Sequence, residues 1–407
     1  MAETWSGNRP RELNDDTIVA VRRRIGIPVR YTTRAHNEVS SIDSFRHFAM
    51  AYGDDNPLYT DPAYAQASAW GSSIAPPLYA FNSGRWSPVE LSDSERAEMK
   101  GDPLAGIGQY MCGERWLFVR PVRAGDLLWR TQHLFSADLK TSAFGGGTGA
   151  LVSHRVGWED ESGSPFAFRF LDFWHADREK SRKAGKNRSV EPAVYTDEDV
   201  DRIDAAYAAE VVRGATPRLG SDVSVGDEID PIVKGPLTVT EMVSWHVGIG
   251  WGEYGGGASK VAYKNRQRVP KFYLKNQLGF METAQRCHWD DEWAQRMGHP
   301  AAYDYGVMRS NWMVNLVTNW MGDSAWIWKL STAVRKFNYM GDVHFISGVV
   351  REVDQAANTV TLDVQGVNQR GVVTCDARAV VILPPATGGH AVIPEYDPAD
   401  VPEASAP

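Results

Sequence analysis

The sequence is poor in cysteine and contains no long hydrophobic run. Its 407 residues include three cysteines, Cys112, Cys287 and Cys375, with no CxxC pair. This spacing offers no disulfide framework and is typical of reduced thiols. The longest purely aliphatic stretch, residues 379–383, is far shorter than the roughly 20 apolar residues of a membrane helix. Because the first residues include an acid and no apolar run, we expect a cytoplasmic protein with no membrane partner.

The chain also lacks a basic excess and lacks the usual signatures of nucleotide or metal binding. Its 43 Lys+Arg against 51 Asp+Glu give a net charge of −8, which disfavours general nucleic-acid binding. The glycine triplets at 145–147 and 255–257 are not followed by the residues of a phosphate-binding loop. No spacing of His, Cys and acids is typical of a metal site. We therefore expect neither a metal nor a cofactor.

What the chain does have is length, tryptophan and an internal repeat. The length predicts two or three domains, and the 15 Trp favour thick cores or an aromatic-lined pocket, with cores preferred. A basic run followed by an acidic, Ala-rich stretch between residues 178 and 210 indicates a linker with one short helix. The Pro- and Ala-rich residues after 383 predict an extended or disordered tail.

The same order of features occurs on both sides of this linker. Tyr52-Gly53-Asp54 ends one helical pattern, and Trp251-Gly252-Glu253 ends another. Tyr59-Thr-Asp61 in the first half corresponds to His288-Trp-Asp290 in the second. Two halves of common ancestry explain this repeat most economically.

Each half combines a helical pattern with strand-like runs. Met308, Trp312, Leu316 and Trp320 recur every four residues after Gly306 and predict a largely buried helix. Runs rich in β-branched residues predict antiparallel strands in both halves. These runs are 127–136, 148–158, 166–175, 342–353, 359–367 and 372–383. One long helix wrapped by antiparallel strands is an α+β unit.

The string from Gly53 to Asp61, Gly-Asp-Asp-Asn-Pro-Leu-Tyr-Thr-Asp, followed by Ile-Ala-Pro-Pro at 74–77, resembles the hydratase motif D-x-N-P-x-H-x-D of the MaoC-like enoyl-CoA hydratases and dehydratases. With the repeat, this resemblance implies two tandem hotdog units packed as a pseudo-dimer. We expect an N-terminal unit at 20–180, a linker at 181–224, a C-terminal unit at 225–385 with an insertion at 254–287, and an extended tail at 386–407.

The resemblance implies a site in which a carboxylate and an imidazole hold one water, while backbone N–H groups at a helix start bind the thioester oxygen. The first half keeps Asp54 and Asn56 but has Tyr59 where the family has its histidine. A tyrosine is a poor base because its reference pKa is near 10. The first half is therefore expected to hold the acyl group without catalysing.

In the second half His288 matches the family histidine, but Thr283 stands where the family has its aspartate. If the insertion loops out, Glu253 and His288 form the dyad. Glu282 and Asp304 are rival carboxylates. Gly306 is the candidate backbone amide near the thioester oxygen. His246 is expected to be a packed core residue.

Other residues have supporting roles in this interpretation. Trp251 and Trp289 flank the proposed dyad and would contact substrate, and Asp61 and Asp290 would cap turns. The insertion carries Lys260, Lys264, Arg266, Arg268, Lys271 and Lys275. Such residues suit either a cover over the CoA pantetheine and phosphates or an ordinary surface loop.

The function expected from the resemblance is that of an enoyl-CoA hydratase or 3-hydroxyacyl-CoA dehydratase. It would act on an acyl-CoA thioester, for which the tryptophan content favours a bulky or aromatic acyl group, and would need no cofactor beyond the CoA of the substrate. The chain is expected to form homodimers or higher oligomers. A non-catalytic partner or scaffold subunit is the alternative, and a thioesterase or other thioester lyase on the same fold is the third.

Overall fold

The computed structural model describes residues 13–31, 34–142, 147–177, 190–250 and 256–402. The described α-helices are α1 (Asp15–Arg22), α2 (Ile42–Ala51), α3 (Pro57–Thr60), α4 (Pro62–Ala67), α5 (Asp93–Glu98), α7 (Asp197–Ala208), α8 (Val239–Ile249), α9 (Ser259–Arg268), α10 (Asp291–Arg296) and α11 (Gly306–Met321). The strands are β1 (Arg85–Trp86), β2 (Gly108–Phe118), β3 (Trp129–Ser142), β4 (Gly147–Glu159), β5 (Pro165–Ala176), β6 (Glu228–Lys234), β7 (Tyr273–Lys275), β8 (Met281–Thr283), β9 (Trp326–Val334), β10 (His344–Asp354), β11 (Thr359–Asn368) and β12 (Val373–Ile382).

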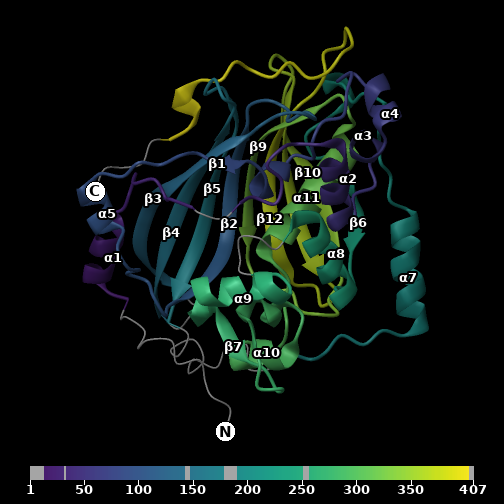
Figure 1. Cartoon of the computed structure of the whole chain (residues 1–407). Helices are drawn as coiled ribbons and strands as arrows, with labels where there is room; N and C mark the ends of the chain where they lie inside the picture. Colours follow the sequence, from purple (N-terminus) through teal and green to yellow (C-terminus); the bar gives the residue numbers. More distant parts are fainter. Residues whose placement is uncertain (1–12, 32–33, 143–146, 178–189, 251–255, 403–407) are drawn as a thin grey trace.

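A single 10-stranded sheet runs through both halves of the chain, in the order β1-β3-β4-β5-β2-β9-β12-β11-β10-β6 (Figure 1). Strands β1–β5 form the N-terminal half of the sheet, and β6 with β9–β12 form the C-terminal half. The two halves meet where β2 pairs antiparallel with β9, with Trp116 opposite Leu330. The six strands predicted from β-branched runs are all present. The expected α+β fold with two tandem hotdog units is confirmed.

The long helix of the C-terminal half lies where the sequence predicts it. Helix α11 begins at Gly306 and packs against β9–β12, β6 and β2. Trp312, Leu316 and Trp320, which define its predicted apolar stripe, are buried at 3%, 0% and 9% exposure. The stripe is wide because strands surround the helix on several sides. This helix is the centre of the main hydrophobic core.

The N-terminal half differs from the expectation of one long helix per unit. Between Pro77 and β2 the described chain forms a short 3₁₀ helix, η1 (Tyr79–Asn82), the two-residue strand β1 and the six-residue helix α5. Gly84 breaks the helix by adopting φ +92°, and a Cβ there would lie 3.0 Å from the carbonyl oxygen of Leu128. The N-terminal part of the sheet therefore has no described counterpart of α11.

Helices α2 and α8, which precede the two motif regions, pack against each other. Their approach is close at Gly248, where a Cβ would lie 2.4 Å from the carbonyl oxygen of His47 and from the Cβ of Ala51. Only glycine fits this contact. The contact places the ends of the two repeats side by side, as expected for a pseudo-dimer.

The connecting segments pack onto the two halves. The linker helix predicted from the Ala-rich stretch is α7, in which Ile203 is buried. The tail was expected to be extended or disordered, and its described part is an extended arm. His390 stacks on Trp70 at 4.2 Å between ring centroids, and Tyr396 stacks on Phe168 at 5.4 Å. The tail thereby covers part of the N-terminal half.

The insertion is more structured than the loop expected from the sequence. It contains α9, the short hairpin of β7 and β8, and a 3₁₀ helix, η5 (Ala284–His288). Helix α9 and the hairpin lie together beside α10 (Figure 1). No helix in the described parts of the chain is both long and apolar enough to cross a membrane.

Candidate active site

His288 ends the 3₁₀ helix η5, next to the loop that leads into α11. Its Nδ1 lies 2.9 Å from the carbonyl oxygen of Tyr303. A carbonyl oxygen only accepts, so Nδ1 carries the proton in the neutral ring and Nε2 carries the lone pair. Loss of solvation, opposed by the hydrogen bond to Tyr303 and assisted by the nearby His246, lowers the pKa of His288 to about 4. At neutral pH His288 is therefore an uncharged imidazole that can accept a proton at Nε2.

Tyr305 and His246 border His288. The Tyr305 ring lies 3.8 Å from the His288 ring between centroids, and the Tyr305 hydroxyl lies 3.1 Å from His246 Nε2. His246 Nδ1 donates to the carbonyl oxygen of Met242 at 2.5 Å, so Nε2 accepts from the Tyr305 hydroxyl. Burial lowers the pKa of His246 to about 4. His246 is buried, as predicted, and it also orients a tyrosine of the candidate site.

The predicted tryptophans can be assigned only in part. Trp289 is partly buried and meets the His246 ring edge-on at 5.5 Å between centroids. This contact places Trp289 in the cluster with His288, as expected for a substrate-contacting ring. Trp251 and Glu253 lie outside the described residues, so the Glu253–His288 dyad stays a prediction.

Glu282, the second predicted carboxylate, faces arginine. Arg286 Nη1 donates to Glu282, Asn276 Nδ2 donates to it at 3.2 Å, and Arg286 Nη2 also binds Asp290 at 2.8 Å. The structure thus pairs Glu282 with Arg286 and not with His288. Asp290 caps α10 by accepting from the backbone N–H of Trp293 at 2.8 Å, as predicted. Asp61 likewise caps α4.

Asp304 is buried at 1% exposure and is fully engaged by other side chains. Arg309 binds both of its carboxylate oxygens at 2.9 Å, and Asn338 Nδ2 donates to it at 2.9 Å. Burial raises the pKa of Asp304, while Arg309 and Asn338 oppose the rise. Asp304 therefore acts as a structural anchor for the loop before α11 rather than as a base or a substrate ligand.

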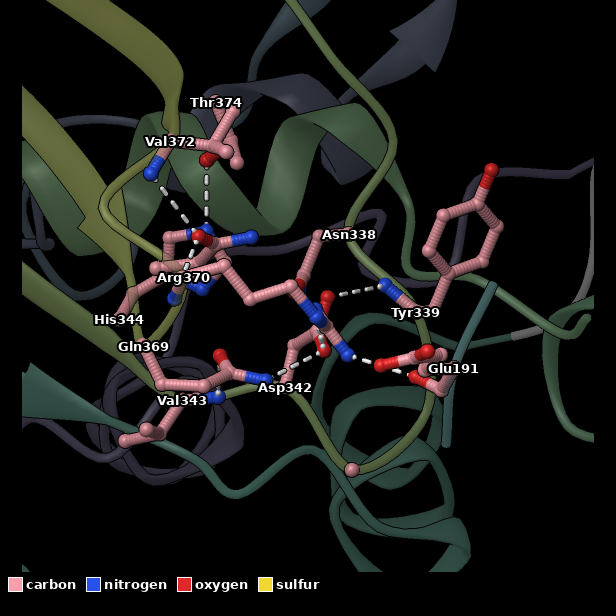
Figure 2. A network of polar contacts seen from close by, with 12 residues as sticks. Glu191, Asn338, Tyr339, Asp342, Val343, His344, Gln369, Arg370, Val372 and Thr374 are labelled. Atoms are coloured by element: carbon pink, nitrogen blue, oxygen red, sulfur yellow. Dashed lines mark hydrogen bonds and ion pairs between the residues drawn. The ribbon is translucent and has the colours of Figure 1, made fainter. Parts of the chain in front are cut away.

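The loop that carries Tyr303 and Tyr305 is held by a buried polar network. Asp304 N donates to the carbonyl oxygen of Asn338 at 3.0 Å, which ties this loop to the turn before β10. Figure 2 shows that turn: Asp342 accepts from the backbone N–H of Tyr339 at 3.1 Å and from Arg370 at 2.5 Å. Arg370 also donates to the carbonyl oxygen of Glu191 at 2.9 Å. The linker, the turn and the loop before α11 are therefore held by one connected set of hydrogen bonds.

Gly306 begins α11, the helix whose N-terminus faces the N-terminal half. The N-cap residue Tyr305 provides no side-chain cap, and its carbonyl oxygen accepts from the N–H of Met308 at 2.9 Å, so the N–H groups of Gly306 and Val307 carry the partial positive charge of the helix start. A Cβ at Gly306 would lie 3.0 Å from Met111 Sδ on β2 and 3.3 Å from Val334 Cγ2 on β9. Glycine is therefore needed here for close packing, and its amide can serve an anionic oxygen.

The N-terminal motif is closed upon itself. Asp54 accepts from the Tyr52 hydroxyl and from the backbone N–H of Asn56, both at 3.0 Å. Asn56 caps α3 and donates to Asp323 at 3.1 Å. Tyr59 is 3% exposed and lines a cavity of about 10 Å³, room for no more than about one water. Asp54, Asn56 and Tyr59 thus do not line space for an acyl group.

Lys234 on β6, a residue that sequence reasoning missed, completes this motif. Its side chain is buried, and Nζ donates to Asn315 at 2.6 Å and to the carbonyl oxygens of Tyr52 and Gly53 at 3.3 and 3.2 Å. Burial raises the pKa of Asp54 to about 6, against the opposing effects of the Asn56 N–H and of Lys234. The motif of the first half has become a contact that holds the second half.

Tyr305 was also missed, although a signal was present. It is the aromatic residue directly before the helix-starting Gly306, in the run Tyr303-Asp304-Tyr305. Its contact with His246 joins residues 59 positions apart, which no local pattern reveals. Within the described residues no three His, Cys, Asp or Glu side chains gather as metal ligands. A larger hollow of about 660 Å³ lies over β6 and β10–β12 and contains none of the predicted site residues.

The fold and the site together define a class: two hotdog units in one chain, with a histidine beside the start of the long helix. Residues 28–168 match the family model described as "FAS1-like, dehydratase domain region". A solved structure named "MaoC-like dehydratase" aligns with a TM-score of 0.58 and 16% identity, over 89% of this chain and 99% of that one. The resemblance predicted from the sequence is confirmed, in fold over most of the chain and in the dehydratase region over residues 28–168.

Two relatives match a shorter segment. "UPF0336 protein" from Streptomyces avermitilis is 34% identical over 97 residues, which are 23% of this chain and 59% of that protein. The protein of the same name from Thermobifida fusca is 34% identical over 101 residues, or 24% and 60%. The chain therefore spans less than two thirds of the length of these relatives.

Proposed function

We propose that this protein is a hydratase or dehydratase that adds or removes water across the 2,3 double bond of an acyl-CoA thioester. The observation that carries the proposal is His288, a half-buried neutral imidazole whose Nδ1 is committed to the carbonyl oxygen of Tyr303 at 2.9 Å. It lies on the loop side of the α11 N-terminus, on a dehydratase fold. This pairing of a base with backbone N–H donors suits chemistry that passes through an enolate.

The reaction can be written with these groups alone. In hydration, water attacks the β-carbon of the enoyl thioester while His288 Nε2 takes one water proton. The π electrons move to the thioester oxygen, and the N–H groups at Gly306 stabilise the enolate. The α-carbon then takes a proton from protonated His288, or from a carboxylic acid beside it, and the neutral imidazole is restored. Dehydration follows the same steps in reverse.

Glu253 is the proposed carboxylate of the site. It follows the end of α8, the helix that carries His246, by four residues. A carboxylate near His288 would favour the protonated imidazole and bring its pKa closer to neutrality, where a catalytic base works best. Glu253→Gln is therefore expected to lower kcat/KM and to shift its acid limb to lower pH.

The CoA part of the substrate is supported by the basic insertion. Residues 260–275 contain six Lys and Arg and no acid, in a chain whose net charge is −8. Helix α9, which carries four of them, has no buried residue. This positively charged, exposed segment precedes His288 in the sequence, and its charge would attract the CoA phosphates.

A non-catalytic partner subunit is the second candidate, and one observation favours it. Glu282 and Asp304, the two described carboxylates proposed for the dyad, are each ion-paired with an arginine. If Glu253 also fails to serve, the chain would bind thioesters or complete another hydratase without turnover.

A panel of 2-enoyl-CoA substrates with His288→Ala tests the proposal. Loss of a general acid–base residue typically costs about 10²–10⁴-fold, and we expect kcat/KM to fall by at least about 100-fold. His299→Ala is the matched control, because His299 packs against the Tyr303 ring at 4.6 Å much as His288 does at 4.7 Å. Equal losses in both variants would contradict a catalytic role for His288. No turnover of any enoyl-CoA by the wild type, with retained acyl-CoA binding, would favour the partner subunit.

A further inference from the structure

The inner face of the N-terminal half of the sheet is unusual for a surface that should hold an acyl chain. Trp116 on β2 pairs with Arg169 on β5, and Arg169 pairs with Val156 on β4. Paired residues share a face of a sheet. Trp116 and Val156 belong to the same core cluster as Met308 of α11, so this face looks inward.

A charged pair lies in the middle of this inner face. Arg169 Nε donates to Glu114 Oε2 at 2.5 Å, and the two side chains are 7% and 1% exposed. The guanidinium lies over the rings of Trp116 and Phe81, at 5.2 and 5.6 Å from their centroids. A face built only for hydrocarbon would not retain a buried ion pair, because desolvating one is costly.

The same face has buried donors that no described group accepts. Trp116 is 3% exposed, and its Nε1–H has no hydrogen-bond partner in the described structure. The ring is fixed between Trp158 and Phe118, each stacked at 5.3 Å, so the N–H cannot turn away. An unpartnered buried N–H is costly, and a ligand acceptor would recover this cost.

Part of this face is also not covered by the protein's own side chains. Leu171 pairs with both Glu114 and His154 and therefore shares their face. Leu171 and Phe173 are only partly buried although they point toward the inside of the molecule. The position corresponds to the missing counterpart of α11 in this half. The uncovered area lies next to the ion pair, because Leu171 pairs with Glu114.

The face continues to the proposed thioester site. Met111 on β2 pairs with Phe173 on β5, and Met111 Sδ lies 3.0 Å from the position of a Cβ on Gly306. Met111 and Glu114 pair with Phe173 and Leu171, which are two positions apart on β5 because β2 has a bulge after Met111, so they are about 7 Å apart along the sheet. An acyl group whose thioester is held at Gly306 would reach the Glu114–Arg169 pair with its middle or distal carbons.

We propose, on the basis of the hydratase function above, that this inner face selects acyl groups carrying a hydrogen-bond-accepting oxygen, such as a keto, ether or hydroxyl group, at a distance from the thioester. The Trp116 indole N–H and the Arg169 guanidinium are the donors, and Glu114 holds the guanidinium in place. A plain alkyl chain leaves these donors unsatisfied and desolvates the ion pair. The substrate class is therefore an oxygenated acyl-CoA.

Matched substrates test this selection. Pairs of 2-enoyl-CoA thioesters of equal length, one all-carbon and one with an ether or keto oxygen moved one position at a time along the chain, are compared by kcat/KM. Sites built to bind a polar group reject analogues that lack it. We expect a preference of at least about 10-fold for the oxygenated member at the best position.

Two tryptophan variants locate the selection. Trp116→Phe keeps an aromatic ring and removes the N–H. The ratio of kcat/KM for the oxygenated substrate to that for the all-carbon substrate should therefore fall toward 1. Trp158→Phe is the control, because the Trp158 Nε1–H already donates to the carbonyl oxygen of Ser83 at 3.1 Å. It should keep the preference, with folding of both variants checked by thermal melting. A preference that survives in Trp116→Phe as in Trp158→Phe overturns the assignment.

A binding measurement separates this inference from the proposed function. Calorimetric titration with saturated acyl-CoA analogues of the same two kinds needs no turnover. Turnover without preference for oxygen overturns the inference and leaves the hydratase function standing. Absence of turnover refutes the hydratase function, and the inference then holds as a binding specificity if the oxygenated analogue binds more tightly, or fails if the two bind equally.

Discussion

In the N-terminal half the loop around Asp54 is closed by its own hydrogen bonds, whereas in the C-terminal half His288 lies beside the open end of a long helix. Asp54 binds Tyr52 and Asn56, and the cavity by Tyr59 has room for no more than about one water. His288 uses one nitrogen for Tyr303 and keeps the other as a lone-pair site. The same ancestral order of residues has become a structural contact in one half and a candidate catalytic site in the other.

The difference follows from what surrounds each copy. The first motif meets Lys234 and Asp323 of the second half, which bind its carbonyl and amide groups. The second motif meets the insertion and the loop before α11. A repeated motif therefore keeps its backbone shape more readily than its chemistry, because chemistry depends on the groups that the other half presents.

The largest expected effect is the response of stability to acid. Unfolded histidine binds a proton near pH 6.5. Burial lowers the pKa of His154, His175, His246 and His288 to about 4 and that of His344 to about 3. Between pH 7 and 5 the unfolded state is protonated and the folded rings are not, so folding loses roughly 1–2 kcal/mol per histidine.

Asp54 is expected to change stability in the opposite direction to the histidines when the pH is lowered. Its folded pKa of about 6 lies above its unfolded value, so ionisation destabilises the fold above pH 6 and acidification relieves this cost. Urea unfolding at pH 7, 6 and 5 measures the sum, which we expect to fall by several kcal/mol. Asp54→Asn should steepen the fall. Equal stability at pH 7 and 5 would contradict buried neutral histidines.

The next largest effect is expected at Lys234, which joins the N-terminal motif to β6. Lys234→Met leaves Asn315, two carbonyl oxygens and Asp54 without their buried cation, and we expect a loss of about 3–5 kcal/mol in the free energy of unfolding. Lys329→Met is the control, because its pair with Asp400 is 39% and 31% exposed and is worth at most about 1 kcal/mol. Similar losses in the two variants would argue against the role of Lys234 between the halves.

The smallest effect is expected at Asn56. Asn56→Ala removes the cap of α3 and the hydrogen bond to Asp323, for a loss of about 2–3 kcal/mol. Asn14→Ala removes only the exposed cap of α1, where Asn14 accepts from Thr17 N at 3.0 Å, for about 1 kcal/mol. Chemical unfolding of both variants gives the two losses in unfolding free energy. The additional loss in Asn56→Ala measures the contribution of its hydrogen bond to Asp323. Equal losses in the two variants would mean that the Asn56–Asp323 hydrogen bond makes no net contribution to stability.

Much of the fold could be predicted because its signals are local. The fourfold spacing of Met308, Trp312 and Leu316 defines one face of a helix whatever surrounds it. The caps at Asp61 and Asp290 act within three residues of the capping side chain. The missing long helix of the first half was not predicted, because the apolar segment after Pro77 is compatible with a helix until Gly84 approaches Leu128.

The site was predicted in outline and differs in detail. His288 and Trp289 lie in one cluster, and Gly306 begins the helix beside it. Glu282, one of the predicted partners, is ion-paired with Arg286, which lies four residues further on. Asp304 precedes the helix as predicted but is held by Arg309, which lies five residues further on, inside α11. Such pairings are set by side-chain directions that spacing alone does not reveal.

The sequence by itself determined the repeat, the α+β class, the strands and the identity of the histidine before the long helix, since these rest on periodicity and short motifs. Only the tertiary structure decided that Tyr305 joins His246 to this histidine, that Lys234 closes the first motif, and that an ion pair with a tryptophan N–H lies on the inner face. These contacts join residues far apart in the chain, so only the packing of the strands and helices brings them together.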